Sequence, residues 1–304
     1  MKILFMGTTD FAVSCLDAMR QAGYEAEAVV TKTDKPKNRG MKLQFSAVKE
    51  YALQNDIPVY QPETLKTEDV QEALRAYSAD LFVVVAYGKL LPKAVLDMPR
   101  LGCINVHGSL LPRYRGAAPI QWSVLNGDRE AGVSTMYLAE GMDSGDVIDM
   151  VSTPIGTGES FGSIYERLKA LGGELLVRTL RSIEAGTVKA TPQNEAEATY
   201  APPIMKEDTR IDWAWPPEKI VSRICGLDPK PGARAILSGQ EFKLYSPKLT
   251  ENSTDLPNGS VVGSDKNGLE IACGGGKTVR LLELQAPGGK RMRAADYLRG
   301  HKLS

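Results

Sequence analysis

The chain opens with short apolar runs that alternate with amphipathic stretches. A run at residues 2–6 is followed by a glycine and then by apolar positions at helical spacing between 10 and 23, which predicts a strand, a turn and a helix. Further apolar runs at 26–31 and 57–60, with a helical stretch around 45–55 between them, continue this rhythm. The alternation is typical of β-α-β units with a parallel sheet.

The same rhythm continues to about residue 186. Residues 81–88 form a continuous apolar run, LFVVVAYG, which is typical of a strand buried on both faces of a parallel sheet. Two more strands are predicted at 103–107 and 132–138, and a long amphipathic helix at 163–186 ends at a glycine. We therefore expect residues 1–186 to form an α/β domain with a Rossmann-like, doubly wound, mostly parallel sheet.

The composition changes after this first predicted domain. The segment 187–203 has little apolar periodicity and ends in two prolines, which is typical of a linker. Beyond it, a helical stretch at 217–227 is followed by short apolar runs separated by glycine and asparagine turns. Regularly spaced short strands favour a small β-barrel or sandwich, and we expect residues 204–304 to form an OB-like barrel.

Composition and charge exclude several classes of protein. The 304 residues are 42% hydrophobic and 24% charged, which is ordinary globular composition for a chain long enough for two domains. Lys+Arg and Asp+Glu are both 37, so any contact with nucleic acid depends on local clusters of charge. The four cysteines are scattered, and the apolar run at the start is too short for a signal peptide or a membrane span. We expect a cytoplasmic protein with no membrane contact.

Histidines are scarce, which limits the possible chemistry. Only His107 and His301 occur, and His301 lies in a terminal segment that we expect to be frayed. No HExxH motif and no Cys/His cluster compensates for this shortage. The sequence therefore predicts an enzyme without a catalytic metal.

Asn105 and His107 stand two residues apart at the end of a predicted strand. Their side chains should point to the same side, and the carboxyl ends of strands in open α/β sheets border the ligand crevice. The glycine-punctuated turn EGMDSGD (140–146) displays Asp143. Each residue also has an ordinary structural interpretation, as a hydrogen-bonded strand-end histidine, a turn asparagine and a turn-forming aspartate.

The order and spacing of these residues favour a functional interpretation. Asn105, His107, SLLP (109–112), RGAAP (115–119) and Asp143 together resemble the 10-formyltetrahydrofolate-dependent formyltransferases. The resemblance extends from the opening ILFMGTTDFAV through PKNRGMKL to the closing QAPGGKRMRAADYLRG. It is strongest with the enzymes that formylate the methionyl end of initiator tRNA for translation initiation. Sugar-nucleotide N-formyltransferases are the main alternative, and glycinamide ribonucleotide formyltransferase and a folate hydrolase share the same core.

The resemblance implies direct transfer of a formyl group from 10-formyltetrahydrofolate to a primary amine. Attack on the formyl carbon places negative charge on the formyl oxygen and positive charge on the amine nitrogen. The amide of Asn105 and the imidazole of His107 can donate hydrogen bonds to that oxygen, while the carboxylate of Asp143 can orient His107 and help to move the proton. The resemblance further implies a folate site formed by Tyr87, Gly88, Ser109, Leu110, Leu111 and Pro112.

Two basic clusters are candidates for contact with initiator methionyl-tRNA. Residues 32–42 hold five basic residues against one acidic residue, and the resemblance implies that this loop enters the acceptor stem, with Arg39 as its key arginine. A solvated, mobile loop is the alternative interpretation. A second cluster lies near the end of the chain. The predicted tRNA-binding residues are Lys35, Lys37, Arg39, Lys42, Lys290, Arg291 and Arg293. We expect a monomer that needs no other protein partner.

Overall fold

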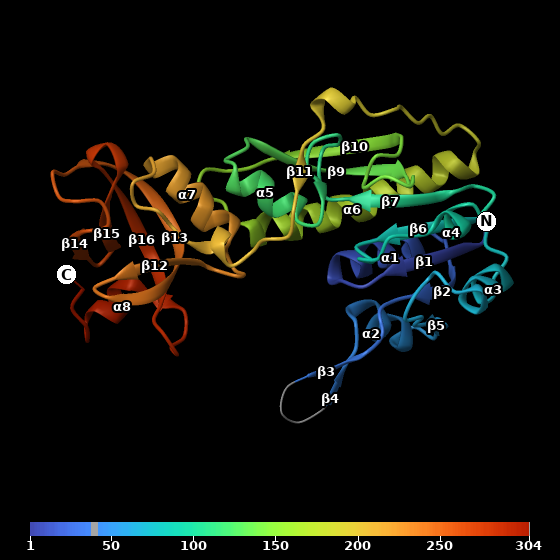
Figure 1. Ribbon diagram of the computed structural model, residues 1–304, viewed down its shortest axis with the longest axis horizontal. Helices are drawn as coiled ribbons and strands as arrows, with labels where there is room; N and C mark the ends of the chain where they lie inside the picture. The colour runs from blue at the N-terminus through green and yellow to red at the C-terminus, as the bar shows by residue number, and fades with distance from the viewer. Residues whose placement is uncertain (38–41, 304) are drawn as a thin grey trace. The chain divides into compact units, whose positions relative to one another are not determined.

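A computed structural model describes residues 1–37 and 42–303 of the chain (Figure 1). The chain folds into two compact units, and each unit takes segments from more than one part of the sequence. The N-terminal unit consists of Met1–Ala117, Gly132–Ser152 and Arg167–Tyr200, and the C-terminal unit consists of Ala118–Ala131, Thr153–Glu166 and Ala201–Ser304. No helix among the described residues is long and apolar enough to cross a membrane.

A seven-stranded sheet forms the centre of the N-terminal unit. Its strands are β1 (Ile3–Gly7), β2 (Ala26–Val30), β5 (Val59–Tyr60), β6 (Leu81–Val85), β7 (Cys103–His107), β9 (Glu130–Tyr137) and β10 (Val147–Pro154). They lie in the order β10-β9-β7-β6-β1-β2-β5. The strands from β5 to β7 are parallel, and β9 is antiparallel to β7. β7 therefore lies inside the sheet, between β6 and β9.

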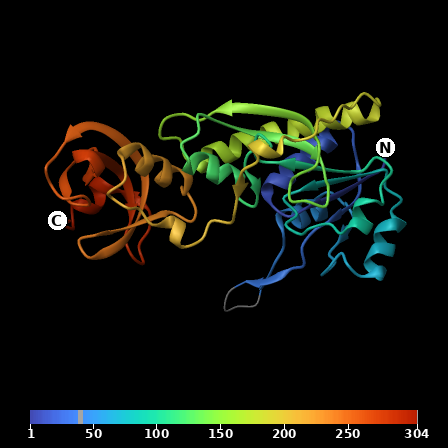
Figure 2. The ribbon, with the colours of Figure 1, turned by 45° about the horizontal axis from the view of Figure 1, so that its top comes forward.

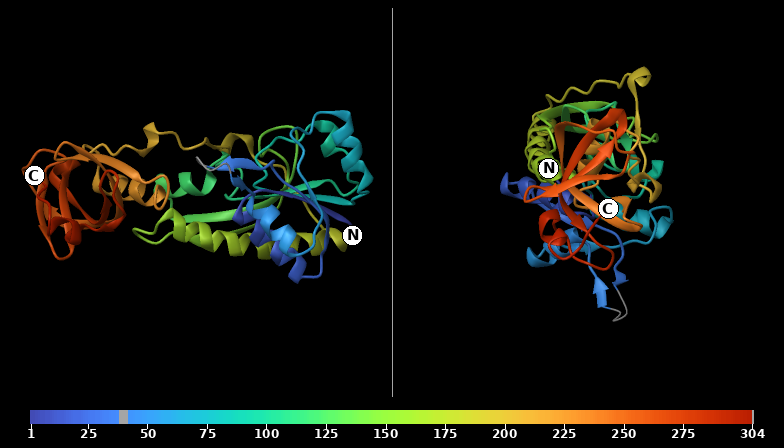
Figure 3. Two further views of the ribbon diagram at one scale, coloured as in Figure 1. Left: turned by 90° about the horizontal axis from the view of Figure 1, so that it is seen from below. Right: turned by 90° about the vertical axis from the view of Figure 1, so that its left-hand side faces the viewer.

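Helices cover both faces of this sheet (Figures 2 and 3). The helices are α1 (Asp10–Gln21), α2 (Ala47–Gln54), α3 (Glu68–Ala76), α4 (Lys93–Leu96) and α6 (Phe161–Glu184). α1 and α6 pack closely on one face, because a Cβ atom on Gly173 of α6 would lie 2.8 Å from Cβ of Ala18. The glycine thus lets two helix backbones approach each other.

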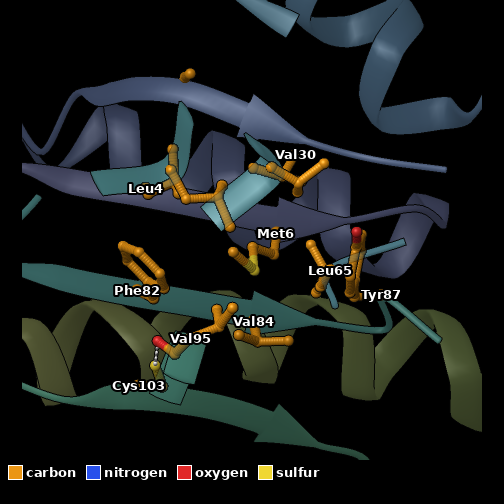
Figure 4. Packing of buried hydrophobic residues seen from close by; sticks show 12 residues of the cluster. Leu4, Met6, Val30, Leu65, Phe82, Val84, Tyr87, Val95 and Cys103 are labelled. Atoms are coloured by element: carbon orange, nitrogen blue, oxygen red, sulfur yellow. Dashed lines mark hydrogen bonds between the residues drawn. The ribbon is translucent and has the colours of Figure 1, made fainter. Parts of the chain in front are cut away.

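The other face of the sheet packs against α3 and α4 (Figure 4). Alternate residues of the strands supply this layer, as the two-residue period of a strand requires, and among them Leu4, Met6, Phe82 and Val84 are buried. Val95 of α4 is fully buried against them. Both faces of the central strands are thus covered, which explains why β1, β6 and β7 are buried along their whole length.

A second, antiparallel sheet forms most of the C-terminal unit. Its strands are β12 (Ala233–Leu237), β13 (Gln240–Ser253), β14 (Val261–Asp265), β15 (Gly268–Cys273), β16 (Lys277–Gln285) and β17 (Met292–Arg293). They lie in the order β12-β13-β16-β15-β14, and β17 pairs with β16. The helices of this unit are α5 (Pro119–Leu125), α7 (Pro217–Gly226) and α8 (Ala294–Leu298). The predicted fold class, a Rossmann-like sheet followed by a β-rich domain, is confirmed.

Several local features were not predicted. α3, β10 and a hairpin of β3 (Lys35–Lys37) and β4 (Lys42–Gln44) have no counterpart in the predicted elements. The strand expected over 81–88 ends at Val85, because the next residue, Ala86, has a φ of 44°. The expected linker contains β11 (Tyr200–Ala201), which pairs with β8 (Arg115–Gly116).

Candidate active site

The strand β7 carries two polar side chains into the interior of the N-terminal unit. Asn105 is 9% exposed and His107 is 5% exposed. Because they are two residues apart on one strand, both side chains leave the same face of the sheet. His107 is also the last residue of β7, so its ring lies where the strand gives way to a loop.

The imidazole of His107 lies between two oxygen atoms. Its Nε2 is 2.9 Å from the carbonyl oxygen of Tyr114, in the loop that follows β7. Its Nδ1 is 3.6 Å from Oδ2 of Asp143. A carbonyl oxygen only accepts hydrogen bonds, so the Nε2–H donates to Tyr114, while the Asp143 carboxylate lies just beyond hydrogen-bond distance of Nδ1.

Asp143 reaches this ring from a distant turn. Its φ is 48°, a left-handed conformation that aspartate tolerates better than most residues. Its Oδ2 accepts a hydrogen bond of 2.8 Å from the backbone N–H of Gly116. The loop after β7 therefore holds the carboxylate beside His107, and the three residues predicted as catalytic are placed at one end of β7.

The predicted folate-binding loop packs against the neighbouring strand. The Oγ of Ser134 on β9 donates to the carbonyl oxygen of Ser109 at 2.7 Å and accepts from the N–H of Leu111 at 3.2 Å. Leu110 lies over Gly132, where a Cβ atom would be 2.3 Å from Cδ2 of the leucine. Pro112 follows a cis peptide bond. The backbone of 109–112 is thus held close to β9.

Tyr87 and Gly88 lie just beyond the end of β6. The ring of Tyr87 is 1% exposed, and burial raises the pKa of its hydroxyl to about 12. That hydroxyl has no hydrogen-bond partner among the described residues, which is unusual for a buried polar atom. Gly88 has a φ of 71°, and a Cβ atom there would lie 2.5 Å from Nζ of Lys32. The end of β6 therefore combines a tight backbone turn with an unsatisfied donor.

The predicted tRNA-binding loop is described only in part. Arg39 lies outside the described residues, while Lys35, Lys37 and Lys42 lie on the backbone of the β3–β4 hairpin, where Lys37 stands opposite Lys42. An ion pair stabilises the base of this hairpin. Lys49 Nζ is 2.5 Å from Asp34 Oδ2, and this hydrogen bond is the main reason why the pKa of the Asp34 carboxyl lies below its usual value.

The second predicted tRNA-binding cluster divides into two kinds of residue. The guanidinium of Arg291 pairs with Asp228 at 2.6 Å and with Glu283 at 2.6 Å. It also lies 4.2 Å from the centre of the Tyr245 ring, an arrangement that ties β13, β16 and the loop after α7 together. Lys290 and Arg293 are exposed. Arg291 is thus engaged within its own unit, whereas its two basic neighbours face solvent.

Three residues near Asp143 were not identified from the sequence. Arg115 is 2% exposed and binds Gln193 and Glu195 through its guanidinium. Gln193 and Glu195 belong to the expected linker, where no sequence pattern indicated a role. The only sequence signal was the RGAAP motif that contains Arg115, and it indicated the family without indicating this contact.

The described part of the chain contains no group of three or more His, Cys, Asp and Glu side chains that could hold a metal ion. The ring of His107 contacts the carbonyl of Tyr114 and lies beside the carboxylate of Asp143. The arrangement can donate hydrogen bonds to a developing negative charge and can accept a proton.

Comparison with known proteins agrees with this chemistry. The chain matches the formyl transferase family over residues 1–180 and the formyl transferase C-terminal domain over residues 203–302. It is 46% identical to the methionyl-tRNA formyltransferase of Agathobacter rectalis, over 99% of this chain and 96% of the relative. It is 44% identical to the enzyme of that name from Thiobacillus denitrificans, over 100% of this chain and 98% of the relative.

Solved structures show the same fold at lower identity. The sugar 3N-formyltransferase WlaRD superposes with a TM-score of 0.71 at 20% identity, over 92% of this chain and 97% of that chain. HypX from Aquifex aeolicus superposes with a TM-score of 0.68 at 19% identity, over 98% of this chain and 47% of that chain. These likenesses establish the fold, whereas the full-length relatives establish the family. The chain belongs to the formyl transferase family, among the methionyl-tRNA formyltransferases.

Proposed function

We propose that the chain transfers the formyl group of 10-formyltetrahydrofolate to the α-amino group of methionyl initiator tRNA. The observation that carries this proposal is the full-length similarity to methionyl-tRNA formyltransferases, together with an amide, an imidazole and a carboxylate at one end of β7. The proposed catalytic residues are Asn105, His107 and Asp143. Formation of N-formylmethionyl-tRNA would place the enzyme in translation initiation, and therefore in the cytoplasm.

Asn105 and His107 have the chemistry to stabilise charge on the formyl oxygen. An amide N–H and an imidazole N–H donate hydrogen bonds, and both side chains are buried, where such bonds are stronger than in water. Loss of one donor of this kind typically reduces a rate by about 10²–10³-fold. The position of His107 is fixed by the carbonyl oxygen of Tyr114. A ring N–H must therefore leave its present oxygen neighbour before it can donate to the formyl oxygen.

Asp143 has the chemistry to manage the proton that the attacking amine must lose. Its carboxylate lies next to His107 and can orient the ring. It can also accept the proton of the amine, directly or through a water molecule. A positioned acid or base of this kind contributes about 10²–10⁴-fold to a rate.

The proposed folate donor supplies an electrophilic formyl carbon when it is bound. The residues proposed to hold it are Tyr87, Gly88 and the loop 109–112. The buried hydroxyl of Tyr87, which has no partner among the described residues, fits a ligand that brings a hydrogen-bond acceptor. The residues present thus fit a flat, polar-edged ring such as a pterin.

The tRNA is proposed to bind through basic residues. They are Lys35, Lys37, Arg39 and Lys42 of the hairpin region together with Lys290 and Arg293, with Arg291 supporting them from its ion pairs. Contacts of this kind with phosphates give affinity that weakens as salt is added. We further propose a catalytic domain at 1–186, a linker at 187–203 and a tRNA-binding domain at 204–304. The enzyme is proposed to act as a monomer.

An acceptor assay tests the proposed function. Purified protein is incubated with 10-formyltetrahydrofolate and, in separate reactions, methionyl initiator tRNA, an amino-sugar nucleotide or no amine. We expect mass spectrometry to find formylmethionine only in the first reaction. Formylation of the sugar alone would instead support a sugar-nucleotide formyltransferase. Release of formate without an amine would support a hydrolase.

A further inference from the structure

Gln193 connects two segments that form the candidate active site. It lies after α6, in the segment that leads to β11. We infer that Gln193, held by Arg115, is a positioning residue that orients the Asp143 carboxylate toward His107. The inference rests on the proposed formyl transfer, because it assigns Gln193 a role in that reaction.

The side-chain amide of Gln193 makes two hydrogen bonds to nitrogen at one end and two to oxygen at the other, and Nε2 also contacts Sδ of Met136 at 3.9 Å. Its Oε1 accepts from Nε and Nη2 of Arg115, at 3.1 and 2.9 Å. Its Nε2 donates to the carbonyl oxygens of Asp143 and Gly145, at 2.8 and 2.7 Å. The partners determine the orientation of the amide, because a guanidinium only donates and a carbonyl only accepts. Only a side chain that is an acceptor at one atom and a donor at the next satisfies both sides.

Arg115 is itself firmly held, so it can act as a fixed support. Its side chain is 2% exposed, and Glu195 binds it at two nitrogens, with N···O distances of 2.9 and 2.7 Å. This hydrogen-bonded pair raises the pKa of Arg115 and lowers the pKa of Glu195. The backbone N–H of Arg115 donates to the carbonyl oxygen of Thr199 at 2.8 Å. Displacing Gln193 would leave part of a buried cation unpaired, which is costly.

The turn that carries Asp143 needs support from outside. Asp143 has a φ of 48°, which is strained for a residue with a side chain. Two residues later, a Cβ atom on Gly145 would lie 1.8 Å from the carbonyl oxygen of Tyr137, so the turn lies directly against the end of β9. Gln193 binds the carbonyl groups of both turn residues. It therefore fixes the backbone from which the carboxylate extends.

Arg115 and Gly116 hold Asp143 through two separate sets of contacts. Gly116, which directly follows Arg115, donates its N–H to Asp143 Oδ2 at 2.8 Å. Arg115 reaches the backbone of the same aspartate through Gln193. One short segment, 115–116, thus holds Asp143 at both its side chain and its backbone. The same Oδ2 lies 3.6 Å from His107 Nδ1, so a shift of the turn changes this distance directly.

The substitution Gln193→Glu tests this role with little change in shape. It places a carboxylate oxygen against two carbonyl oxygens, while the contact with Arg115 remains. We expect kcat for methionyl-tRNA formylation to fall by about 10²-fold, the loss typical of a catalytic group displaced by about 1 Å. KM for the tRNA and for the folate should stay at the parent values. If this variant does not fold, Gln193→Met, which is similar in length and has no polar group, replaces it.

A matched control uses a hydrogen-bonded glutamine elsewhere in the same unit. Gln71 on α3 is 6% exposed and donates through Nε2 to the carbonyl oxygen of Leu65 at 3.1 Å. Gln71→Glu places an acceptor against a carbonyl in the same way, away from Asp143. We expect this variant to keep the parent kcat. An equal loss of kcat in both variants would overturn the inference, because the effect would then follow from any disturbed hydrogen-bonded amide.

Two further measurements separate positioning from a general loss of stability. In an Asp143→Asn background, Gln193→Glu should cause almost no further loss of kcat, because both changes remove the same contribution. Multiplicative losses would overturn the inference, and so would a parent-like kcat for Gln193→Glu alone. Hydrogen–deuterium exchange of the Gly116 amide and of residues 141–145 should become faster in Gln193→Glu and stay unchanged in Gln71→Glu.

The exchange experiment needs no substrate. A parent protein that formylates no tRNA would therefore refute the proposed function while the hydrogen bonds of Gln193 remained testable. Unchanged exchange in Gln193→Glu, with an active parent enzyme, would refute the positioning role alone.

Discussion

The carboxylate of Asp143 combines two functions that one substitution can separate. Its Oδ2 accepts from the N–H of Gly116 and lies near Nδ1 of His107. An asparagine keeps an oxygen for the backbone donor, but it carries no negative charge and cannot take up a proton. The turn should therefore keep its shape when Asp143 is replaced by asparagine.

Asp143→Asn should lower kcat by about 10²–10⁴-fold, the usual contribution of a positioned acid or base. KM for both substrates should stay near the parent values, because the fold around the site is preserved. Steady-state kinetics on methionyl-tRNA measure both effects. Asp149→Asn is the control, since Asp149 pairs with Arg178 on the surface, and it should behave like the parent. A parent-like kcat for Asp143→Asn would remove this residue from the mechanism.

The four cysteines should be unreactive in the folded chain. All are buried, and burial raises the pKa of Cys103 and of Cys225 to about 12 and also raises that of Cys15 and Cys273. At pH 8 the thiols therefore stay protonated, and only a thiolate reacts. Titration with a disulfide reagent should detect almost no thiol until denaturant is added, and then four. A variant with an exposed thiol, Lys66→Cys, should react at once.

The raised pKa values of the buried cysteines also make the stability of the fold depend on pH. A thiol whose folded-state pKa lies above its unfolded value of about 8.5 favours the folded state while it is protonated. This contribution is complete below about pH 8.5 and is lost as the pH rises toward 12. A rapid reaction of any native cysteine at pH 8 would contradict the prediction.

At the scale of elements, the β3–β4 hairpin is supported at its base. Lys49 pairs with Asp34 and also donates a hydrogen bond to Oε1 of Gln61. The Nε2 of Gln61 in turn donates to the carbonyl oxygen of Lys32 at 2.7 Å. Lys49 lies on α2, which packs on the sheet. The strands that flank Arg39 thus begin from a fixed point.

Arg39→Ala should weaken the use of tRNA while leaving folate binding unchanged. Loss of one arginine contact with nucleic acid costs about 1–3 kcal/mol, so KM for methionyl-tRNA should rise by roughly tenfold or more. Its dependence on salt should also become weaker. Kinetics at two salt concentrations measure both effects. Lys66→Ala, which removes an exposed charge elsewhere, should change neither, and an Arg39→Ala enzyme as selective as the parent would contradict the loop's role.

At the scale of the whole molecule, the C-terminal unit needs a helix from the first half of the sequence. α5 packs against α7, where a Cβ atom on Gly226 would lie 2.6 Å from Cγ of Leu125. Gln121 donates to the carbonyl oxygens of Gly226 and Lys230. A fragment of residues 204–304 lacks these partners, although it contains the entire antiparallel sheet.

We expect the fragment 204–304 to unfold at a lower temperature than the C-terminal unit of the full chain. Burial of one leucine side chain is worth about 1.5–3 kcal/mol, and the fragment loses the whole apolar contact of α5. Differential scanning calorimetry of both proteins measures the difference. Leu125→Ala in the full chain is the matched variant and should destabilise the same unit by about 2–5 kcal/mol. If the fragment and the C-terminal unit of the full chain unfolded at the same temperature, α5 would contribute nothing to the stability of that unit.

The linear pattern of residues determined the fold class, the order of the main elements and the family. Apolar runs such as those of β1, β6 and β7 predict buried strands, because burial on both faces leaves no place for polar residues. The strand pattern also predicted that Asn105 and His107 share one strand end, while their catalytic interpretation depended on the resemblance to the family. Asp143 depended on the resemblance to the family, because a turn aspartate by itself is common.

Only the tertiary structure decided how the distant segments meet. Gln193 and Glu195 lie in a segment without apolar periodicity, which predicted a linker, yet they bind Arg115 and the turn of Asp143. Likewise, Arg291 is one basic residue among several in the sequence and an ion-pair partner of Asp228 in the fold. The physical reason is that periodicity reports which residues are buried in regular elements. A hydrogen bond between polar side chains in loops depends on positions that the whole fold creates, and it leaves no repeat in the sequence.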